Sequence, residues 1–331
     1  MSIAAACFSP DGKTLVTASL EGVLAQWDAD TGRRLRVLLD PQGIDDAPAP
    51  SAYSVVDGRR VDAGFRLERL SECMRGSPLR SVCLSADGAY LAVGAANGAV
   101  VVWSVERSCE CMSWLAHEAE VTALDISPDG RWLVAGSAKQ PGPTLRVWSL
   151  SGSWPVMGKE VLADGWHGYG VWSACFSPDS RFLVAGGRAN AAETGPMIYD
   201  VETGERVGDL FNDVVPSLHY SPDGKVIATG DSFGTVSIWD AETRTRLRRV
   251  RAHGAMVSAL QFSPDGRRLA SGSRDGEVKI LDSGSGDQVE KHSVAGAVLA
   301  VRISPDERAL FVAEAADDAS QPRIHRLARM R

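Results

Sequence analysis

Several side chains in this sequence belong to the types that bind metals. Four of them share a setting, because each lies two residues before a serine that recurs along the chain: Cys7, Cys83, Cys175 and His219. Thiolates and imidazoles are preferred zinc ligands, but the ligands of one ion must converge on a single point. Each of these residues belongs to a different copy of a repeat, and we expect the copies to hold them apart. We therefore predict no metal site.

The chain also lacks the sequence patterns that are typical of catalysis. A nucleophile beside a base, paired carboxylates and a phosphate-binding glycine loop each have a recognisable spacing, and none is found. The glycine-rich stretch at 94–98 is predicted to be a turn, and the recurring aspartates belong to a repeated turn. We predict no catalytic residue and no cofactor, and we expect that the protein is not an enzyme.

That repeated turn is the clearest signal in the sequence, and its full form is Ser-Pro-Asp-Gly. Seven copies occur, at 9–12, 85–88, 127–130, 177–180, 221–224, 263–266 and 304–307. Proline presets φ, aspartate can bond the backbone ahead of it, and glycine accepts a positive φ. The copies are spaced by 76, 42, 50, 44, 42 and 41 residues. A period just above 40 indicates one structural unit that is stacked repeatedly.

A short apolar segment precedes every turn. Counted back from the serine, positions one, three and six are apolar or aromatic in all copies, and position four is always small. Since side chains alternate along a strand, this pattern predicts an inner strand that is packed on both faces. A second strand such as 268–273, a third such as 278–281 and a more polar outer segment such as 245–250 follow. Four short strands per period predict a propeller blade.

Over nearly its full length the chain resembles the WD40-repeat family. Third strands end in Trp27-Asp28, Trp103-Ser104, Trp148-Ser149, Tyr199-Asp200, Trp239-Asp240 and Leu281-Asp282, and loops before inner strands carry His117, His167 and His253. The resemblance implies an all-β, seven-bladed propeller of four-stranded antiparallel blades in a single domain, 1–331. The blades are expected at about 3–39, 79–115, 121–162, 171–211, 215–251, 257–292 and 298–328.

The resemblance also implies a buried hydrogen-bond network in each blade. In the family, a loop histidine, a second-strand serine or threonine, a turn aspartate and the third-strand tryptophan form it. The sixth blade carries His253, Ser271 and Asp275 but has Leu281 in place of the tryptophan; the fifth carries Thr229, Trp239 and Asp240 but has Phe233 in place of the turn aspartate. No blade keeps all four members of the network.

Two parts of the chain depart from the repeat. Residues 40–78 are an insertion between the first two blades, and 53–61 within it resemble a hairpin. The outer strand of the first blade is either 33–39 or 65–73. The last blade shows no fourth strand, which leaves three explanations: a three-stranded blade, excision from a longer protein, or a strand donated by the insertion or by a partner. We favour the three-stranded blade.

Shorter insertions occur at 138–144, 163–170, 188–195 and 315–323. In the resembling family, all these loops lie on one face, the top face, opposite the serine turns. Binding loops grow where a rigid scaffold carries them, so we predict a binding site there. Its candidate residues are Trp166, His167, Tyr169 and Trp172, with Arg80 and Thr122 near the same channel mouth. Local packing of the aromatic residues under the loop is the alternative interpretation.

These observations predict a protein-interaction scaffold, or a sensor or regulatory propeller, that binds a protein partner through its top face, alone or within a larger complex. The alternative is a propeller enzyme or small-ligand receptor that uses the channel mouth near Arg80, Thr122 and Trp172. The net charge of −7 gives no broad attraction to nucleic acid, and no apolar run is long enough for a membrane span. Without a secretion signal or a disulfide pattern, we expect a cytoplasmic protein.

Overall fold

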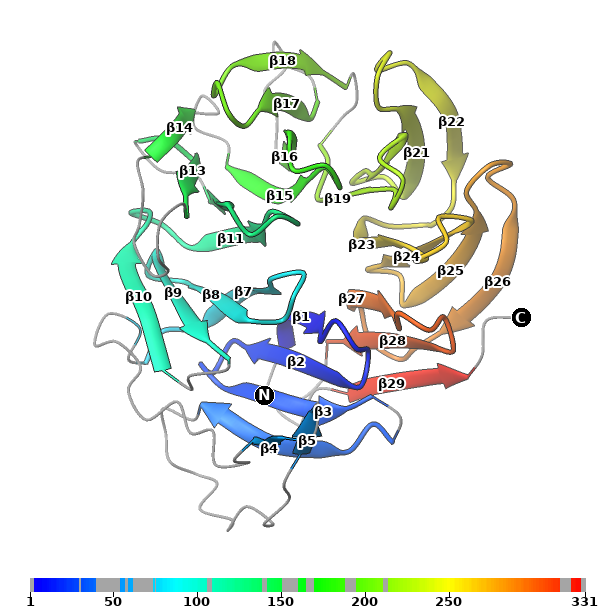
Figure 1. Ribbon diagram of the computed structural model, residues 1–331. Coiled ribbons are helices and arrows are strands. Elements are labelled where there is room, and N and C mark those ends of the chain that lie inside the picture. The colour runs from blue at the N-terminus through cyan, green and yellow to red at the C-terminus, as the bar shows by residue number, and fades with distance from the viewer. Residues whose placement is uncertain are drawn as a thin grey trace.

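The computed structural model describes residues 3–29, 31–39, 54–56, 59–61, 74, 76–105, 109–138, 142–150, 160–164, 170–187, 195–210, 214–315 and 323–328. All of their strands except β5 and β6 form seven antiparallel sheets that are arranged radially in a ring (Figure 1). This arrangement confirms the predicted seven-bladed, all-β propeller. No helix in these residues is long and apolar enough to cross a membrane.

Each blade is a meander of consecutive strands, with its first strand innermost. Blade 1 contains β1 (Ile3–Phe8), β2 (Thr14–Ser19), β3 (Leu24–Asp28) and β4 (Arg34–Leu39). Blade 2 contains β7 (Leu79–Leu84), β8 (Tyr90–Ala95), β9 (Ala99–Ser104) and β10 (Cys109–Leu115). Blade 3 contains β11 (Val121–Ile126), β12 (Trp132–Ser137), β13 (Leu145–Ser149) and β14 (Glu160–Asp164).

Blade 4 contains β15 (Val171–Phe176), β16 (Phe182–Gly187), β17 (Met197–Asp200) and β18 (Arg206–Asp209). Blade 5 contains β19 (Ser217–Tyr220), β20 (Val226–Gly230), β21 (Thr235–Asp240) and β22 (Arg246–Arg251). Blade 6 contains β23 (Val257–Phe262), β24 (Arg268–Ser273), β25 (Glu277–Asp282) and β26 (Gln288–Ser293). Blade 7 contains β27 (Val298–Ile303), β28 (Ala309–Glu314) and β29 (Arg323–Ala328). Within the described residues its sheet has three strands, as favoured from the sequence.

The described residues include β4 of the first blade and a short hairpin of the insertion. The outer strand of blade 1 is β4, which pairs with β3, whereas the other candidate, 65–73, lies outside the described residues. Strand β5 (Ser54–Val56) pairs with β6 (Arg59–Val61) as a separate two-stranded sheet, in agreement with the predicted hairpin.

All seven serine turns adopt the same hydrogen-bonded geometry. The serine hydroxyl donates to the aspartate Oδ1 at 2.5–2.7 Å in every copy. The same hydroxyl oxygen accepts the backbone N–H five residues ahead, at the start of the second strand. The turn therefore joins the first two strands through contacts that lie within six residues of sequence. We call the end of the propeller that carries these turns the bottom face.

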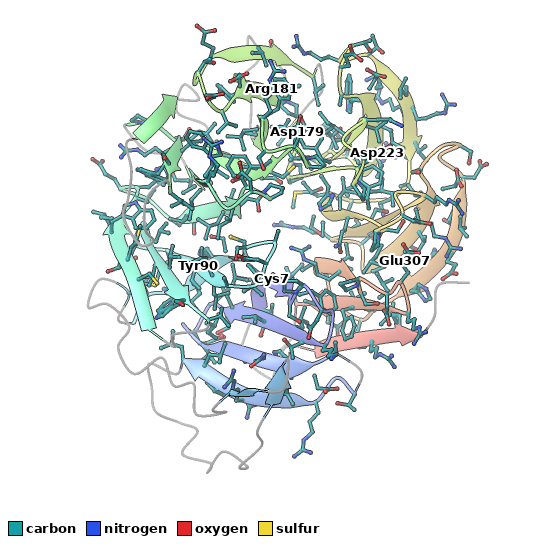
Figure 2. All side chains as sticks on the ribbon, viewed as in Figure 1. Cys7, Tyr90, Asp179, Arg181, Asp223 and Glu307 are labelled. Carbon is teal, nitrogen blue, oxygen red and sulfur yellow. The ribbon has the colours of Figure 1, made fainter. Side chains whose placement is uncertain are left out.

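The fourth turn position requires a left-handed backbone, and two blades place a residue other than glycine there. Ser180 has φ +63° and Glu307 has φ +57°. Each side chain accepts the backbone N–H of the aspartate in the preceding blade's turn, from Asp129 to Ser180 Oγ at 3.0 Å and from Asp265 to Glu307 Oε1 at 2.9 Å. Figure 2 labels Glu307 in its turn. The serine and the glutamate that stand in place of glycine thus each form a hydrogen bond between neighbouring blades.

The ring closes where blade 1 meets blade 7. The rings of Phe8 and Phe311 meet edge to face, with centroids 5.1 Å apart. They belong to one apolar cluster that joins the two blades: Ile3, Ala6, Leu15, Ala29, Ala300, Ala309, Phe311 and Ala313, with Phe8 and Trp27 at its edge. On the bottom face Gly12 lies so near Pro305 that a Cβ at Gly12 would stand 2.6 Å from the proline ring. Side-chain packing therefore closes this seam.

Candidate functional site

A β-bulge near the start of the inner strands shapes the centre of the ring. In six of the seven blades, the pairing of the first two strands skips the residue five positions before the repeated serine. Blade 5 has Pro216 at this position. Residues three apart in a regular strand point to opposite faces, but a bulge re-aims the side chain. The residues five and two positions before each serine can therefore face the same channel.

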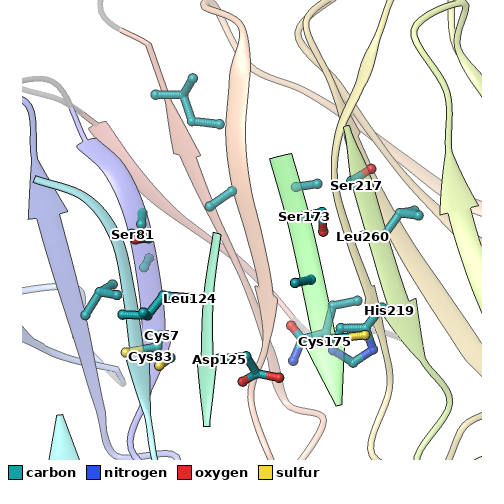
Figure 3. Close-up of a pocket in the computed structure, with 18 of the residues that line it drawn as sticks. Cys7, Ser81, Cys83, Leu124, Asp125, Ser173, Cys175, Ser217, His219 and Leu260 are labelled. Carbon is teal, nitrogen blue, oxygen red and sulfur yellow. The ribbon is translucent and has the colours of Figure 1, made fainter. Parts of the chain in front are cut away.

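These two positions form two rings of side chains around a cavity of about 400 Å³. The mouth ring, nearer the top face, consists of Ala4, Arg80, Thr122, Trp172, Pro216, Ser258 and Leu299. The deep ring consists of Cys7, Cys83, Asp125, Cys175, His219, Gln261 and Arg302. Figure 3 shows the labelled members of the deep ring at one level of the channel.

The mouth ring brings together three of the residues that the sequence singled out. Arg80 forms an ion pair with Glu120, with Nε and Oε2 2.8 Å apart. The Thr122 hydroxyl contacts the carbonyl oxygens of Val171, in the next blade, and Gly136. Trp172 is half-buried against the cavity. The other candidates, Trp166, His167 and Tyr169, lie outside the described residues.

The deep ring is a buried polar environment in which every thiol stays protonated. Burial raises the pKa of Cys7 to about 12, and it raises the pKa values of Cys83 and Cys175 well above that of an ordinary thiol. All three cysteines are free. Since metal ligation requires thiolates, these thiols are poor ligands at neutral pH.

Asp125 is the one acidic side chain of the deep ring. Its Oδ1 accepts the backbone N–H of Ile126 and its Oδ2 accepts that of Phe176 in the next blade, both at 3.0 Å. Burial nevertheless raises the pKa of this carboxyl to about 7, against the effect of these bonds and of Arg302. Asp125 is therefore only partly ionised near neutral pH.

The family network is present in fragments. In blade 5, the Trp239 indole donates to Thr229 Oγ1 at 2.9 Å. In blade 6, His253 Nε2 lies 2.9 Å from Ser271 Oγ, and its Nδ1 lies 3.6 Å from Asp275 Oδ2.

Asp240 lies apart from the blade 5 pair, in an exposed turn. Its Oδ1 accepts the backbone N–H groups of Glu242 and Thr243. It therefore shapes the turn after the third strand and takes no part in the Trp239–Thr229 contact.

Two further fragments occur in blades that sequence comparison with the family pattern did not single out. The Trp27 indole donates to Thr17 Oγ1 at 2.8 Å in blade 1. In blade 3, His117 Nε2 lies 3.1 Å from the carbonyl oxygen of Ala135, which occupies the serine position. Burial lowers the pKa of His117 to about 4.

Among the residues that the structure describes, one group of side chains has the spacing for a metal ion. Potential ligand atoms of His253, Asp275 and Glu277 lie within 4.8 Å of one another. Glu277, however, already pairs with Lys279 at 3.3 Å and with Lys291. Two ammonium groups at the carboxylate oppose the binding of a cation there, so we assign no metal to this group.

Sequence reasoning overlooked two exposed apolar side chains on the top face. Phe233, in the turn between β20 and β21, is 60% exposed, and Leu115, at the end of β10, is 63% exposed. The signal for Phe233 was present in the sequence, because the family pattern expects an aspartate there. An aromatic residue in that place is either buried against its blade or offered to solvent, and only the structure distinguishes the two.

Comparison with known proteins gives the same assignment as the fold. The model of the family described as "WD domain, G-beta repeat" matches residues 1–28, 69–104, 109–149, 159–190, 207–240 and 244–282. Apoptotic protease-activating factor 1 of Rattus norvegicus is 27% identical over 252 residues, which cover 70% of this chain and 19% of that protein. Elongator complex protein 2 of Dictyostelium discoideum is 27% identical over 187 residues, covering 51% and 21%.

A third relative, Autophagy-related protein 16 of Arabidopsis thaliana, is 24% identical over 244 residues, which cover 69% of this chain and 45% of that protein. The chain thus spans between about a fifth and a half of the length of these relatives. Six matched repeats and a ring of seven blades show that the chain belongs to the WD40-repeat family.

Proposed function

We propose that this propeller is a non-enzymatic scaffold or regulator that binds a protein partner through its top face. The name of Elongator complex protein 2 describes that relative as a component of a complex, which supports a role in assembly. A cytoplasmic location and the absence of nucleic-acid binding remain predictions.

The exposed side chain of Phe233 is the observation that carries the proposal. A phenyl ring that is 60% exposed gains about 1–2 kcal/mol when a partner covers it completely. Trp172, half-buried at the channel mouth in the neighbouring blade, offers a second aromatic surface on the same face. Aromatic residues frequently dominate the energetics of protein interfaces.

The backbone that presents Phe233 is held on both sides. Asp231 Oδ1 accepts the N–H groups of Phe233 at 2.8 Å and Thr235 at 2.7 Å. The carbonyl of Gly234 accepts the N–H of His253, at the start of the next blade, at 2.9 Å. A side chain on a fixed backbone loses little conformational freedom on binding, so the turn is suited to an interface anchor.

The test compares partner recovery by three forms of the full chain. Wild type, the double variant Trp172→Ala/Phe233→Ala and the control Leu247→Ala are immobilised, and recovered proteins are quantified by mass spectrometry. Leu247 is also an exposed apolar side chain, 43% exposed, but it lies on the outer strand of blade 5.

We expect the double variant to recover the specific partner at least about tenfold less, since the loss of two anchors exceeds 1.4 kcal/mol. The control should match wild type. Equal recovery by all three forms, with unchanged melting temperatures, would refute the proposed site. Loss in the control as well would place the interface on the rim of blade 5 and outside the top face.

A further inference from the structure

Arg302 contributes a positive charge to the deep ring that the described part of the protein does not neutralise. Its Nη1 donates to the neighbouring carbonyl of Val301 at 2.8 Å, and no carboxylate of a described residue lies within ion-pair distance. The other arginine that lines the cavity, Arg80, is paired with Glu120 at the mouth. A partly buried charge without a counter-ion is costly, and this one lines a cavity that a small ligand can occupy.

No other member of the deep ring forms an ion pair with Arg302, although Asp125 attracts it electrostatically. Burial keeps the thiol of Cys7, on the adjacent strand β1, protonated at neutral pH. The carboxylate oxygens of Asp125 already accept two backbone N–H groups. Strands β11, which carries Asp125, and β27, which carries Arg302, also lie on opposite sides of the ring (Figure 1).

Gln261, on the other neighbouring strand β23, adds a second donor. Its Oε1 accepts the N–H of Ile303 at 2.7 Å, which fixes the orientation of the amide. The amide nitrogen, which can donate two hydrogen bonds, has no protein acceptor among the described residues. Arg302 and Gln261 therefore form a donor side of the deep ring, built on β23 and β27.

Two other members of the deep ring, His219 and Asp125, offer acceptors. His219 Nδ1 lies 2.7 Å from the carbonyl oxygen of Tyr220, and this contact places the imidazole proton on Nδ1. Burial lowers the pKa of His219 to about 4, so the ring is neutral at pH 7 and its Nε2 is an acceptor. Asp125 is the other acceptor, on the side of the ring that faces Arg302. The strong donors, Arg302 and Gln261, and the acceptors, His219 and Asp125, thus line one cavity from different strands.

We propose that the deep ring binds a small organic acid that carries a carboxylate and a hydrogen-bond donor, such as a hydroxyl or ammonium group. The carboxylate accepts hydrogen bonds from Arg302 and Gln261, and the hydroxyl or ammonium group donates to Asp125 or His219. A cavity of about 400 Å³ accommodates such a molecule. Trp172, the second anchor of the proposed top-face site, lines the mouth of the same cavity, but it is not a member of the deep ring. Variants of the deep ring and of Phe233 change different side chains, so the two proposals can fail independently.

The experiment measures binding of three acids of similar size to the purified full chain. Glycolate, glycine and acetate are titrated in the millimolar range at pH 7 and constant ionic strength, by calorimetry and by the shift of the melting temperature. We expect saturable binding of glycolate or glycine, and at least about fivefold weaker binding of acetate, which has no second donor.

Two variants test the assigned roles. Arg302→Gln should weaken binding of the preferred acid at least about tenfold, whereas Arg302→Lys should retain part of the affinity because it keeps the charge. Asp125→Asn should reduce the preference for glycine over acetate. Arg308→Gln, which makes the same charge change in an exposed turn of the bottom face, is the control and should bind as wild type does.

Two results would overturn the proposal. One is the absence of saturable binding of all three acids to the folded wild-type protein. The other is equal affinity of wild type and Arg302→Gln, provided that both show the same cooperative unfolding transition. If Arg302→Gln does not fold, Arg302→Lys takes its place. Affinities of Arg302→Lys for acetate, glycolate and glycine that all equal those of wild type would then place the acid elsewhere.

Discussion

The bottom turns and the buried polar contacts inside the blades hold the same blades together by opposite strategies. At the bottom, a serine, an aspartate and nearby backbone groups repeat one geometry in all seven blades. Inside the blades, blade 1 uses tryptophan with threonine, blade 3 histidine with a carbonyl, and blade 6 histidine with serine.

The difference follows from the distance along the chain between the partners. The bottom contacts join residues two to five apart, so one short segment contains all that the turn requires. The buried polar contacts inside the blades join residues 10 or 18 apart and place several side chains in one buried site. Loss of one member leaves the others to find new partners, as His117 does at Ala135. Local contacts are therefore kept as a unit, and dispersed contacts diverge one blade at a time.

The largest effect should come from the buried indole of blade 5. Trp239→Ala removes a side chain that is 3% exposed together with its bond to Thr229, and we expect a loss of about 3–5 kcal/mol in the free energy of unfolding. Trp239→Phe, which keeps most of the packing, should cost about 1–3 kcal/mol, because the hydrogen bond from the indole to Thr229 is lost. Urea denaturation measures both. Equal losses in the two variants would show that the hydrogen bond, and not packing, dominates this contact.

A change of pH should distinguish the contribution of the buried histidine of blade 3 to stability from that of the serine turns. The folded pKa of His117 is about 4, below its ordinary value of 6.5, so the unfolded chain binds the proton more readily. Stability from this group is present above pH 6.5 and is lost as the pH falls towards 4, by up to about 3 kcal/mol.

The turn aspartates behave differently as the pH falls. Serine hydroxyls hold the pKa values of Asp87, Asp223, Asp265 and Asp306 below 3.8, so their stabilisation persists above that value and is lost only in stronger acid. His117→Gln should therefore flatten the dependence of stability on pH between 6.5 and 4 and leave the more acidic region unchanged. An identical profile in wild type and variant would contradict the assignment to His117.

The smallest effects should come from the bottom turns, where the comparison predicts equality. Ser221→Ala and Ser263→Ala each remove a hydroxyl that bonds to an aspartate and to a strand N–H. We expect each to cost about 0.5–2 kcal/mol, and the two costs to agree within about 0.5 kcal/mol. Chemical denaturation of the two variants side by side provides the measurement. A difference well beyond that margin would mean that the copies are not equivalent.

The same distinction explains what the sequence could predict. The serine turn lies within six residues, so its chemistry identified the repeat, the blades and the fold. Four residues of the deep ring, Cys7, Cys83, Cys175 and His219, were also recognised as a set from their place before the repeated serine. The environment of the deep ring could not be predicted, because burial, the orientation of Gln261 and the missing counter-ion of Arg302 depend on neighbouring blades that are about 40 residues away. Phe233 was noted as a departure, but its exposure is a property of the folded turn.

The seam between blades 1 and 7 has a mechanical consequence. Every described blade is built from one continuous stretch of chain, and no described strand crosses this seam. It is held by Phe8 against Phe311, by the surrounding small apolar residues and by Gly12 against Pro305. The ring is therefore held closed at this seam by side-chain packing and not by strand pairing. Opening the ring at this seam separates two packed surfaces but breaks no strand pairing. We therefore expect small changes in the pitch of the ring to occur most easily there.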